Sequence, residues 1–372
     1  MKFFNRNIED IRYLSISTVF FSISWLWLSF SFPLKLAILG LPYNEIGLVG
    51  TLTSFPFIVV SFLSRYLGKK FINFALKIPF LIISVFSLIL IFLNIDLTFY
   101  IFIIAITGFF QSMWWISVEI ETGLIGKKGN AEKYSAAWSV PSGLFPLFSG
   151  ALLQYVGFRS LYAIVAVVSM VGFLIQPIER TERKSTKKNP LKRLFLLPMT
   201  FVGIFLGYST YVLVPYLKNA SYSYLDIGIL MAISGVSFAF GSLIAGKLQK
   251  QNYRSFSITA SLLASSLLLL IVNFNIFILS ICLFMGGFGG SLGFSKILAY
   301  IGESEGPRTG VFYYETLFSI GYVSGSFVGG SLVTLLGLND SLIIFLPSLI
   351  YAILLTFTRE KLPPTASFHN IE

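Results

Sequence analysis

Apolar stretches of about 20 residues follow one another along almost the whole chain, separated by short polar segments. A helix of about 20 residues crosses the roughly 30 Å hydrocarbon core of a bilayer, and its backbone hydrogen bonds are satisfied internally. The alternating segments of about ten residues that build a membrane barrel do not occur. We therefore predict an all-α polytopic membrane protein with twelve spanning helices, over residues 13–39, 45–64, 74–94, 98–118, 134–155, 159–177, 194–216, 226–248, 255–273, 276–300, 310–335 and 340–358.

The composition agrees with this pattern. Hydrophobic residues make up 55% of the 372 residues and charged residues only 12%, whereas soluble domains carry about 25% charged residues. Cys282 is the only cysteine, so no intrachain disulfide can form. The only histidine, His369, lies in the polar C-terminal segment, which argues against a histidine metal site within the membrane. We expect no metal and no cofactor.

The basic residues give an orientation. With a cytoplasmic N-terminus, 24 of the 27 Lys and Arg residues fall on or near cytoplasmic segments, and only Lys35, Arg159 and Lys218 fall toward the other side. The formal charge of +11 is then mainly a topology signal with some attraction to anionic lipids, and no nucleic-acid partner is expected. The largest basic cluster, at 178–193, predicts a cytoplasmic linker between six-helix bundles at 1–177 and 194–358, followed by a cytoplasmic tail at 359–372.

The two halves share a repeated motif. YNEIGLVG at 43–50 and YLDIGILM at 224–231 each place an acidic residue, Glu45 or Asp226, before Ile-Gly and an apolar run. An acid in the first turn of a helix interacts favourably with the free N–H groups there, so we interpret both as helix starts. Because both halves have six spans and start on the same side, the repeat is parallel and predicts two bundles that face each other across a central cavity.

These features resemble the major facilitator superfamily of secondary transporters. The loop SFLSRYLGKK at 61–70 keeps Gly68, Lys69 and Lys70 of that family's loop motif, GKLQKQNYR at 246–254 is the equivalent loop, and Pro146 with Gly150 is similar to its G-P-x-x-G pattern. Arg65 and Lys250 stand where the family has the acidic residue that helps lock the cytoplasmic side. The resemblance implies two pseudo-symmetric six-helix bundles and transport by alternating access.

Polar residues at helical spacing within the spans are the candidates for the cavity wall, because polar groups inside a membrane are costly and usually functional. They are Thr18, Ser22, Trp25, Ser29, Gln111, Trp115, Tyr208, Tyr211, Ser319 and Tyr322. Two alternatives remain open. The hydroxyl groups of the first span could bond to their own helix's carbonyl groups. Tyr208 and Tyr211 of the seventh span could anchor at the membrane interface.

Three charged residues are candidates for coupling or gating, namely Glu119, Glu315 and Lys296. The simpler interpretation of Glu119 is a solvated carboxylate near the cytoplasmic interface, and the alternative is a desolvated proton carrier. Lys296 occupies roughly the equivalent position in the second half, where it could close the cytoplasmic side or extend to the interface. Glu315 lies deeper, either as a functional carboxylate or paired with Lys296 or Arg308.

The chain carries no nucleotide-binding motif, so a secondary active transporter is the leading hypothesis. We expect a monomer in the plasma membrane that moves a small neutral or amphiphilic organic solute, in the efflux direction for lipophilic compounds, with protons as the coupling ion if Glu119 or Glu315 titrates. One alternative is a membrane sensor or scaffold that does not transport. Another is an intramembrane enzyme, but the catalytic-looking GGSLG at 289–293 falls within a predicted helix and has no histidine base.

Overall fold

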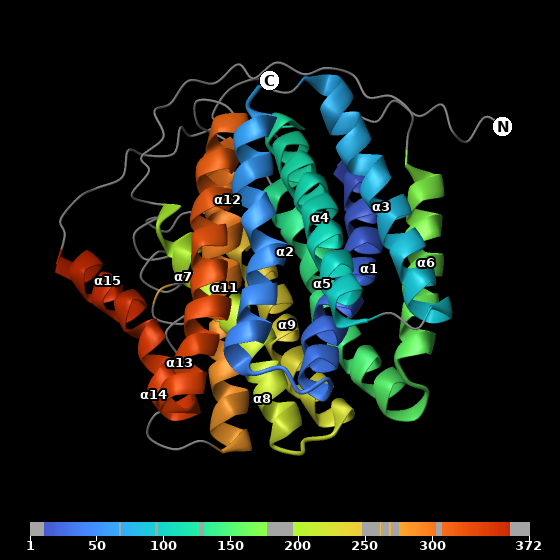
Figure 1. Cartoon of the computed structure of the whole chain (residues 1–372). Coiled ribbons are helices and arrows are strands. Elements are labelled where there is room, and N and C mark those ends of the chain that lie inside the picture. The colour runs from blue at the N-terminus through green and yellow to red at the C-terminus, as the bar shows by residue number, and fades with distance from the viewer. Residues whose placement is uncertain are drawn as a thin grey trace.

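The computed structural model describes residues 11–66, 68–93, 96–125, 130–176, 196–247, 261, 268, 275–302 and 307–357. The N-terminal half contains six helices: α1 (Ile11–Ile38), α2 (Tyr43–Ser64), α3 (Lys69–Phe92), α4 (Leu97–Ile125), α5 (Asn130–Tyr155) and α6 (Phe158–Ile175). They run roughly alongside one another as a bundle (Figure 1).

In the described part of the C-terminal half, three helical runs are built from several elements and two are single helices. The first run is α7 (Pro198–Tyr208), the π-helical turn η3 (Ser209–Leu213) and α8 (Val214–Asn219); α9 (Tyr224–Lys247) and α11 (Ile276–Gly302) are single helices. The last two runs are α12 (Pro307–Val323), η5 (Ser324–Val328) and α13 (Gly329–Leu336), then α14 (Leu338–Ser341), the 3₁₀ turn η6 (Leu342–Phe345) and α15 (Leu346–Phe357). All the elements of the described residues are helical, as predicted.

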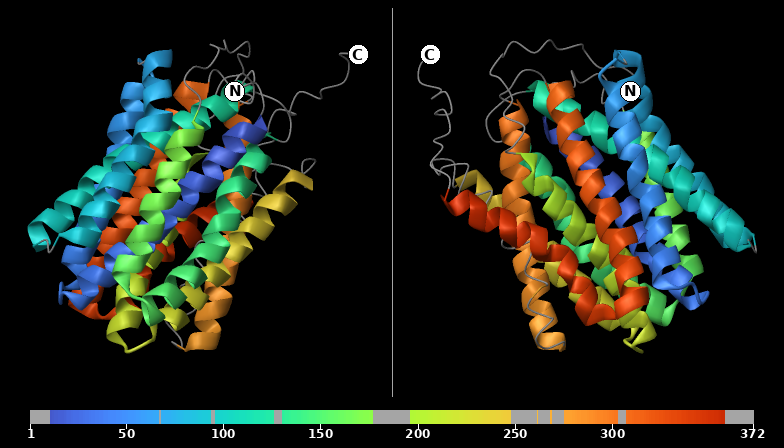
Figure 2. Two further views of the ribbon diagram at one scale, coloured as in Figure 1. Left: turned by 90° about the vertical axis from the view of Figure 1, so that its right-hand side faces the viewer. Right: turned by 60° about the vertical axis from the view of Figure 1, so that its left-hand side comes forward.

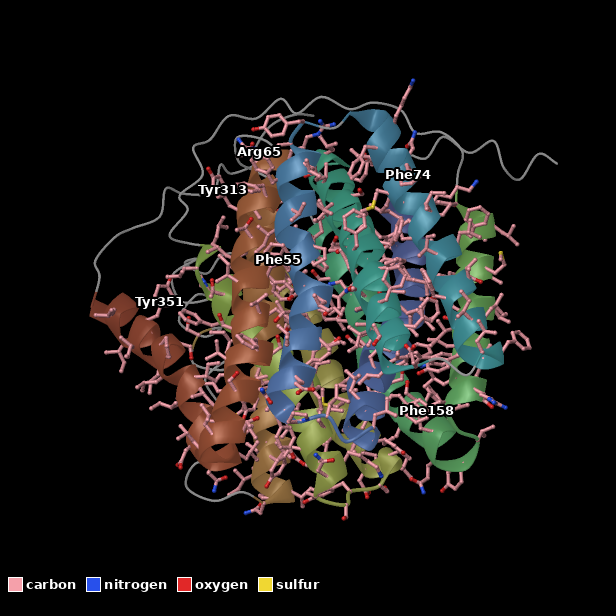
Figure 3. The ribbon with its side chains drawn as sticks, in the orientation of Figure 1. Phe55, Arg65, Phe74, Phe158, Tyr313 and Tyr351 are labelled. Atoms are coloured by element: carbon pink, nitrogen blue, oxygen red, sulfur yellow. The ribbon has the colours of Figure 1, made fainter. Side chains whose placement is uncertain are left out.

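Ten described helical runs are long and apolar enough to cross a membrane, and Leu338–Leu354 is a shorter apolar one. Large apolar side chains such as Phe55 and Phe74 are about half exposed on the outside of the bundle (Figure 3), where a water-facing surface would be largely polar. The prediction of an all-α polytopic membrane protein is therefore confirmed. The predicted ninth span at 255–273, apart from residues 261 and 268, lies outside the described residues, as do the linker at 178–193 and the tail at 359–372.

The π-helical turns interrupt two spans that the sequence predicts as continuous α-helices. In the first, η3 lies just before Pro215, which has no backbone N–H and whose ring crowds the carbonyl group four residues earlier. In the second, the hydroxyl groups of Ser324 and Ser326 donate hydrogen bonds to the carbonyl groups of Ile320 and Tyr322, and such bonds locally distort a helix. Single π turns of this kind occur often at functional sites.

Two pairs of helices join the halves. On one side α5 packs along α9, and on the other α2 packs along α12, η5 and α13. The views in Figure 2 show the helices of each half grouped around this interface. Within the halves, α1 contacts α5 and α6, α3 contacts α6, and α7 contacts α12. These two seams form most of the interface between the halves, and smaller contacts such as those of α1 with α8 and of α4 with α11 and α12 lie between them.

Glycines allow the backbones to approach closely along these seams. A Cβ atom at Gly235 of α9 would overlap the backbone of Ser142 in α5, and one at Gly47 of α2 would overlap the backbone of Ser326 in η5. Gly321 and Gly325 pack in the same way against α7 within the C-terminal half. Gly321 and Gly325 lie four residues apart, a spacing that puts both on one face of the helix and lets a neighbouring backbone approach closely.

The turns between the helices lie at the two ends of the bundle. The α1–α2 end contains the turns at 39–42 and 220–223, and the α2–α3 end contains the turn at 65–68. At the α1–α2 end, Asp226 accepts hydrogen bonds from the backbone N–H and hydroxyl groups of Ser223, and Ser223 Oγ accepts one from the N–H of Asp226. This reciprocal capping box starts α9. The interpretation of Asp226 as a helix-start residue is thus confirmed, and Glu45 likewise lies in the first turn of α2.

Candidate functional site

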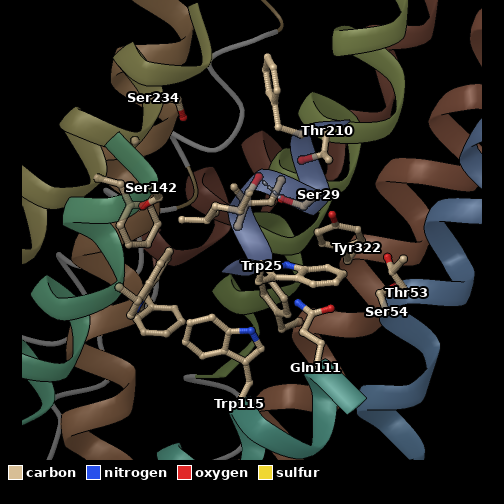
Figure 4. Close-up of a pocket in the computed structure, with 18 of the residues that line it drawn as sticks. Trp25, Ser29, Thr53, Ser54, Gln111, Trp115, Ser142, Thr210, Ser234 and Tyr322 are labelled. Carbon is tan, nitrogen blue, oxygen red and sulfur yellow. Dashed lines mark hydrogen bonds between the residues drawn. The ribbon is translucent and has the colours of Figure 1, made fainter. Parts of the chain in front are cut away.

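A cavity of about 210 Å³ lies between the two halves, in the space that the two seams enclose (Figure 4). Residues from both halves line it, and most are aromatic or carry a hydroxyl group. The lining residues are Trp25, Leu26, Ser29, Phe30, Thr53, Ser54, Phe57, Gln111, Trp115, Glu119, Tyr134, Trp138, Ser142, Pro146, Leu206, Thr210, Val214, Met231, Ser234, Gly235, Phe238, Phe294, Glu315, Phe318 and Tyr322. Among them, Glu119 and Glu315 are the only charged residues, and none of the described lining residues is basic.

Five of the predicted cavity residues belong to this lining: Trp25, Ser29, Gln111, Trp115 and Tyr322. They lie on α1, α4 and α12, and in Figure 4 the side chains of Trp25, Gln111 and Trp115 converge from α1 and α4. Their positions follow from helical spacing, since Gln111, Trp115 and Glu119 recur every four residues and share one face of α4. All three line the cavity.

The other five predicted residues lie outside the lining. Thr18 donates its hydroxyl hydrogen bond to the carbonyl of Leu14 in its own helix, at 2.8 Å. This is the alternative that the sequence left open for the first span. The hydroxyl groups of Tyr208 and Ser341 lie 2.6 Å apart in a hydrogen bond that either can donate.

The remaining three are packed in the interior. The Tyr211 ring lies 2.6 Å from the position that a Cβ atom would take at Gly50. Ser22 and Ser319 are fully buried. None of Tyr208, Tyr211, Ser22 and Ser319 is a residue anchored at the membrane surface, because all four are almost completely enclosed.

The two carboxyl groups of the cavity meet across the interface between the halves. Glu119 lies six residues before the end of α4 and Glu315 eight residues after the start of α12, which places both about 9–12 Å along the helix axes from the α2–α3 end. Both side chains line the same cavity, where α4 packs against α12, and each carboxyl group acts electrostatically on the other. The Tyr134 hydroxyl donates a hydrogen bond of 3.2 Å to Glu119 Oε1.

This arrangement corrects the simpler interpretation of Glu119. Its side chain is only 2% exposed and that of Glu315 only 3%, so Glu119 is not a solvated interfacial carboxylate. The helical pattern places Glu119 on the same face as Gln111 and Trp115, but it cannot show that α12 brings a second carboxyl group to the same point. That juxtaposition depends on how the two halves pack.

Aromatic rings cover the cavity beside the carboxyl pair. Trp138 of α5 contacts the rings of Phe238 on α9 and Phe294 on α11, with centroids 4.6 and 5.1 Å away. On its other side, Trp138 lies 6.2 Å from Trp115. The sequence analysis did not select Trp138, Phe238 or Phe294. Helical spacing within each span could have shown that they are inward-facing, but the apolar character of the spans hides such residues among many others.

The remaining predicted residues lie outside the cavity lining. Lys296 is half-buried on α11 and makes interactions of its own. Arg65, just after α2, places its guanidinium 5.0 Å from the ring centroid of Phe312 on α12, so it contacts the other half at the α2–α3 end (Figure 3). Gly68 precedes α3 and Lys70 is exposed, while the side chain of Lys69 lies outside the described residues.

Comparison with known proteins defines the class of the protein. The family model of the Major Facilitator Superfamily matches residues 14–250 and 196–370, which together span nearly the whole chain. The chain therefore belongs to the Major Facilitator Superfamily of membrane transporters, as the sequence resemblance indicated.

Individual proteins from a bacterium and from human are also similar to it. The glycerol-3-phosphate transporter of Bacillus subtilis (strain 168) is 24% identical over 227 residues, which are 53% of this chain and 50% of that protein. The match thus spans about half the length of this relative. The crystal structure of the human organic anion transporter MFSD10 (TETRAN) superposes with a TM-score of 0.68 at 12% identity, over 93% of this chain and 98% of that one. This structural likeness confirms the fold.

Proposed function

We propose that the protein is a secondary active transporter that moves a small organic solute across the membrane by alternating access. The observation that carries the proposal is the cavity between the two halves, lined by residues of both. Such a cavity can open to either side if one half rocks against the other. The arrangement of the seams supports this, because the cavity lies between the α5–α9 seam and the α2–α12 seam.

The proposed orientation places the α2–α3 end in the cytoplasm. The basic residues Arg65, Lys70 and Arg308 lie toward this end, whereas Lys35, Arg159 and Lys218 lie toward the other, in accordance with the positive-inside rule. Both termini are then cytoplasmic. The location we propose is the plasma membrane, with the protein acting as a monomer among membrane lipids and with efflux as the direction for lipophilic solutes.

The coupling ion that we propose is the proton, carried by Glu119 and Glu315. Two ionised carboxylates side by side in an apolar enclosure repel each other strongly, and a single proton between them removes the repulsion. The pair links α4 of one half to α12 of the other. Gain or loss of its proton would therefore change how strongly the halves adhere at the α2–α3 end.

The names of the two relatives indicate anionic solutes, but the wall of this cavity does not match an anion. Both are named for anions, glycerol 3-phosphate in one case and organic anions in the other. Anion sites in proteins usually contain Arg or Lys, and no described residue of this cavity lining is basic. An amphiphilic solute without a negative charge is a better match to its aromatic and hydroxyl-bearing wall.

The test is uptake by proteoliposomes that contain the purified protein, with a panel of radiolabelled aromatic solutes of neutral, positive and negative charge. We expect at least one solute to accumulate when a pH gradient is imposed, and to accumulate much less without it. The Glu315→Gln variant should equilibrate the solute without accumulating it. The matched control is Glu45→Gln, which removes an exposed carboxylate far from the cavity and should leave accumulation intact.

Two results would contradict parts of the proposal. Binding of a solute without any translocation would favour a sensor or scaffold over a transporter. Accumulation that is unchanged in Glu315→Gln would exclude this carboxyl group as the proton carrier, while leaving transport itself in place.

A further inference from the structure

The charge of the cavity has only one sign. Apart from tyrosine hydroxyl groups, the carboxyl groups of Glu119 and Glu315 are the only ionisable groups in the described lining. It includes no Lys, Arg or His. Even with one proton shared between them, the pair keeps one negative charge within an apolar enclosure. An enclosure of low dielectric strengthens the attraction of that charge for a cation.

Three acceptor oxygens in the lining are buried and receive no hydrogen bond from another donor of the described residues. They are Gln111 Oε1, and Glu119 Oε2 and Glu315 Oε2, which receive none apart from the proton that the carboxyl pair would share; the three side chains are 8%, 2% and 3% exposed. A buried acceptor without a donor costs about 1–3 kcal/mol, and such groups are rare in folded proteins. A ligand that supplies N–H donors or a positive charge would satisfy them.

The wall beside these acceptors is aromatic. Trp25 and Trp115 lie next to Gln111 (Figure 4), and Trp138 and Tyr322 also line the cavity. The faces of Trp and Tyr rings attract cations, and their large apolar surfaces accommodate a hydrophobic body. An anionic group would find no positively charged partner in this described wall.

We propose that the transported solute is an organic cation with an aromatic or aliphatic body, and that its positively charged group binds at Glu119 and Glu315 in place of the shared proton. The inference rests on the proposed transporter function and names its class of substrate. Gln111 orients the cationic head, while the tryptophans hold the body. Solute and proton then compete for one site, which couples their movements in opposite directions.

The surroundings of the pair define the expected pH dependence. The titratable groups that face it are the hydroxyl groups of Tyr134 on α5 and Tyr314 on α12, which stay neutral over the physiological range. The other charged residues on α4, α5 and the helices packed against them, among them Glu121, Lys133, Lys296 and Arg308, do not belong to the lining. Lowering the pH adds protons to the carboxyl pair, so cation binding should weaken as the pH falls.

The first test is binding by the purified protein in lipid nanodiscs, followed through tryptophan fluorescence. Three probes share a phenyl ring: the cation trimethylphenylammonium, its neutral isostere tert-butylbenzene and the anion benzenesulfonate. We expect the cation to bind at least about tenfold more tightly than either other probe, a difference that corresponds to one decade in Kd. This comparison uses the unaltered protein, so it does not depend on whether a variant folds.

The second test replaces the carboxyl groups. Glu119→Gln and Glu315→Gln should each weaken trimethylphenylammonium binding by about tenfold or more and reduce the effect of lowering the pH from about 8 to about 5. Glu45→Gln is the matched control with the same chemical change at an exposed site, and it should bind the cation as the unaltered protein does. Thermal unfolding of each variant establishes that it is folded.

The outcomes separate this inference from the proposed function. Benzenesulfonate binding as tightly as the cation, or cation binding that is insensitive to both Gln replacements in folded protein, overturns the inference. Pumping of a neutral solute without selective cation binding would do the same while sustaining the transporter. Selective, carboxyl-dependent cation binding without transport in proteoliposomes would support the binding site and contradict the transporter.

Discussion

The two ends of the central cavity are closed by different chemistry. At the α1–α2 end, the halves are joined by neutral hydrogen bonds: the Asn44 N–H donates to Thr334 Oγ1 at 3.2 Å, and the Asn219 side chain donates to the Tyr43 hydroxyl at 3.0 Å. At the α2–α3 end, the closure includes the carboxyl pair of Glu119 and Glu315. Of these two sets of contacts, only the second contains carboxyl groups.

The two closures therefore respond to different changes. A closure made of neutral bonds and close backbone contacts responds to force and packing, because it offers nothing for a proton or a charged solute to alter. A carboxyl pair that bridges the halves responds directly to the occupant of the cavity. The contrast between the two ends can be tested by changing the contacts at each of them.

Locking the α1–α2 end should stop transport completely. In a Cys282→Ala background, the variant Asn44→Cys with Thr334→Cys places two cysteines where the backbone N–H of Asn44 now contacts the Thr334 hydroxyl. Such neighbours on packed helices are close enough for a disulfide. We expect oxidation to reduce proteoliposome uptake to background and a reductant to restore it.

Each single cysteine in the same background is the control, and it should transport with or without oxidant. Full transport by the quantitatively cross-linked protein would show that this end does not need to open.

Filling the α5–α9 seam should destabilise the fold. Gly235→Ala puts a methyl group into the backbone of Ser142, and overpacking of this kind costs about 1–3 kcal/mol. The control is Gly290→Ala, whose new methyl group would meet the side chains of Phe238 and Val202 at ordinary distances of 3.4 and 3.6 Å. Thermal unfolding in detergent should show a clearly lower Tm for the first variant and little change for the second; equal effects would contradict the packing argument.

A pair of tyrosine variants should produce the smallest but most selective effect. Tyr134→Phe removes the hydrogen bond donated to Glu119. Because such a donor favours the ionised carboxylate, the variant should move the midpoint of pH-dependent transport to higher pH. Tyr43→Phe removes the neutral bond with Asn219, which is worth about 0.5–1.5 kcal/mol, and should leave that midpoint in place. Equal shifts of the two pH profiles would remove the distinction between the ends.

Much of the fold follows from local patterns. The lengths of the apolar runs predict nearly all the described helices, and Asp226 marks the start of α9 through its capping box with Ser223. The π turns were not predicted. An apolar run has the same pattern whether its backbone N–H groups bond to the carbonyl group four residues earlier, as in an α-helix, or five residues earlier, as in a π-helix.

The candidate site could be predicted only in part. The face of α4 that carries Gln111, Trp115 and Glu119 follows from helical spacing, and all three line the cavity. In contrast, Thr18 and Ser22 have the same spacing on α1 but lie outside the lining. Periodicity shows which residues share a face of a helix, but it does not show how far along that face the cavity extends.

By itself, the sequence determined a polytopic helical protein of the Major Facilitator Superfamily, since hydrophobic length and repeated local motifs act within single segments. The tertiary structure alone decided that Glu119 and Glu315 meet. They are separated by 196 positions in the chain and belong to different halves, and no local pattern relates the rotation of α4 to that of α12. Packing along the two seams sets both rotations, and this brings two acids into one cavity that has no basic residue in its described lining.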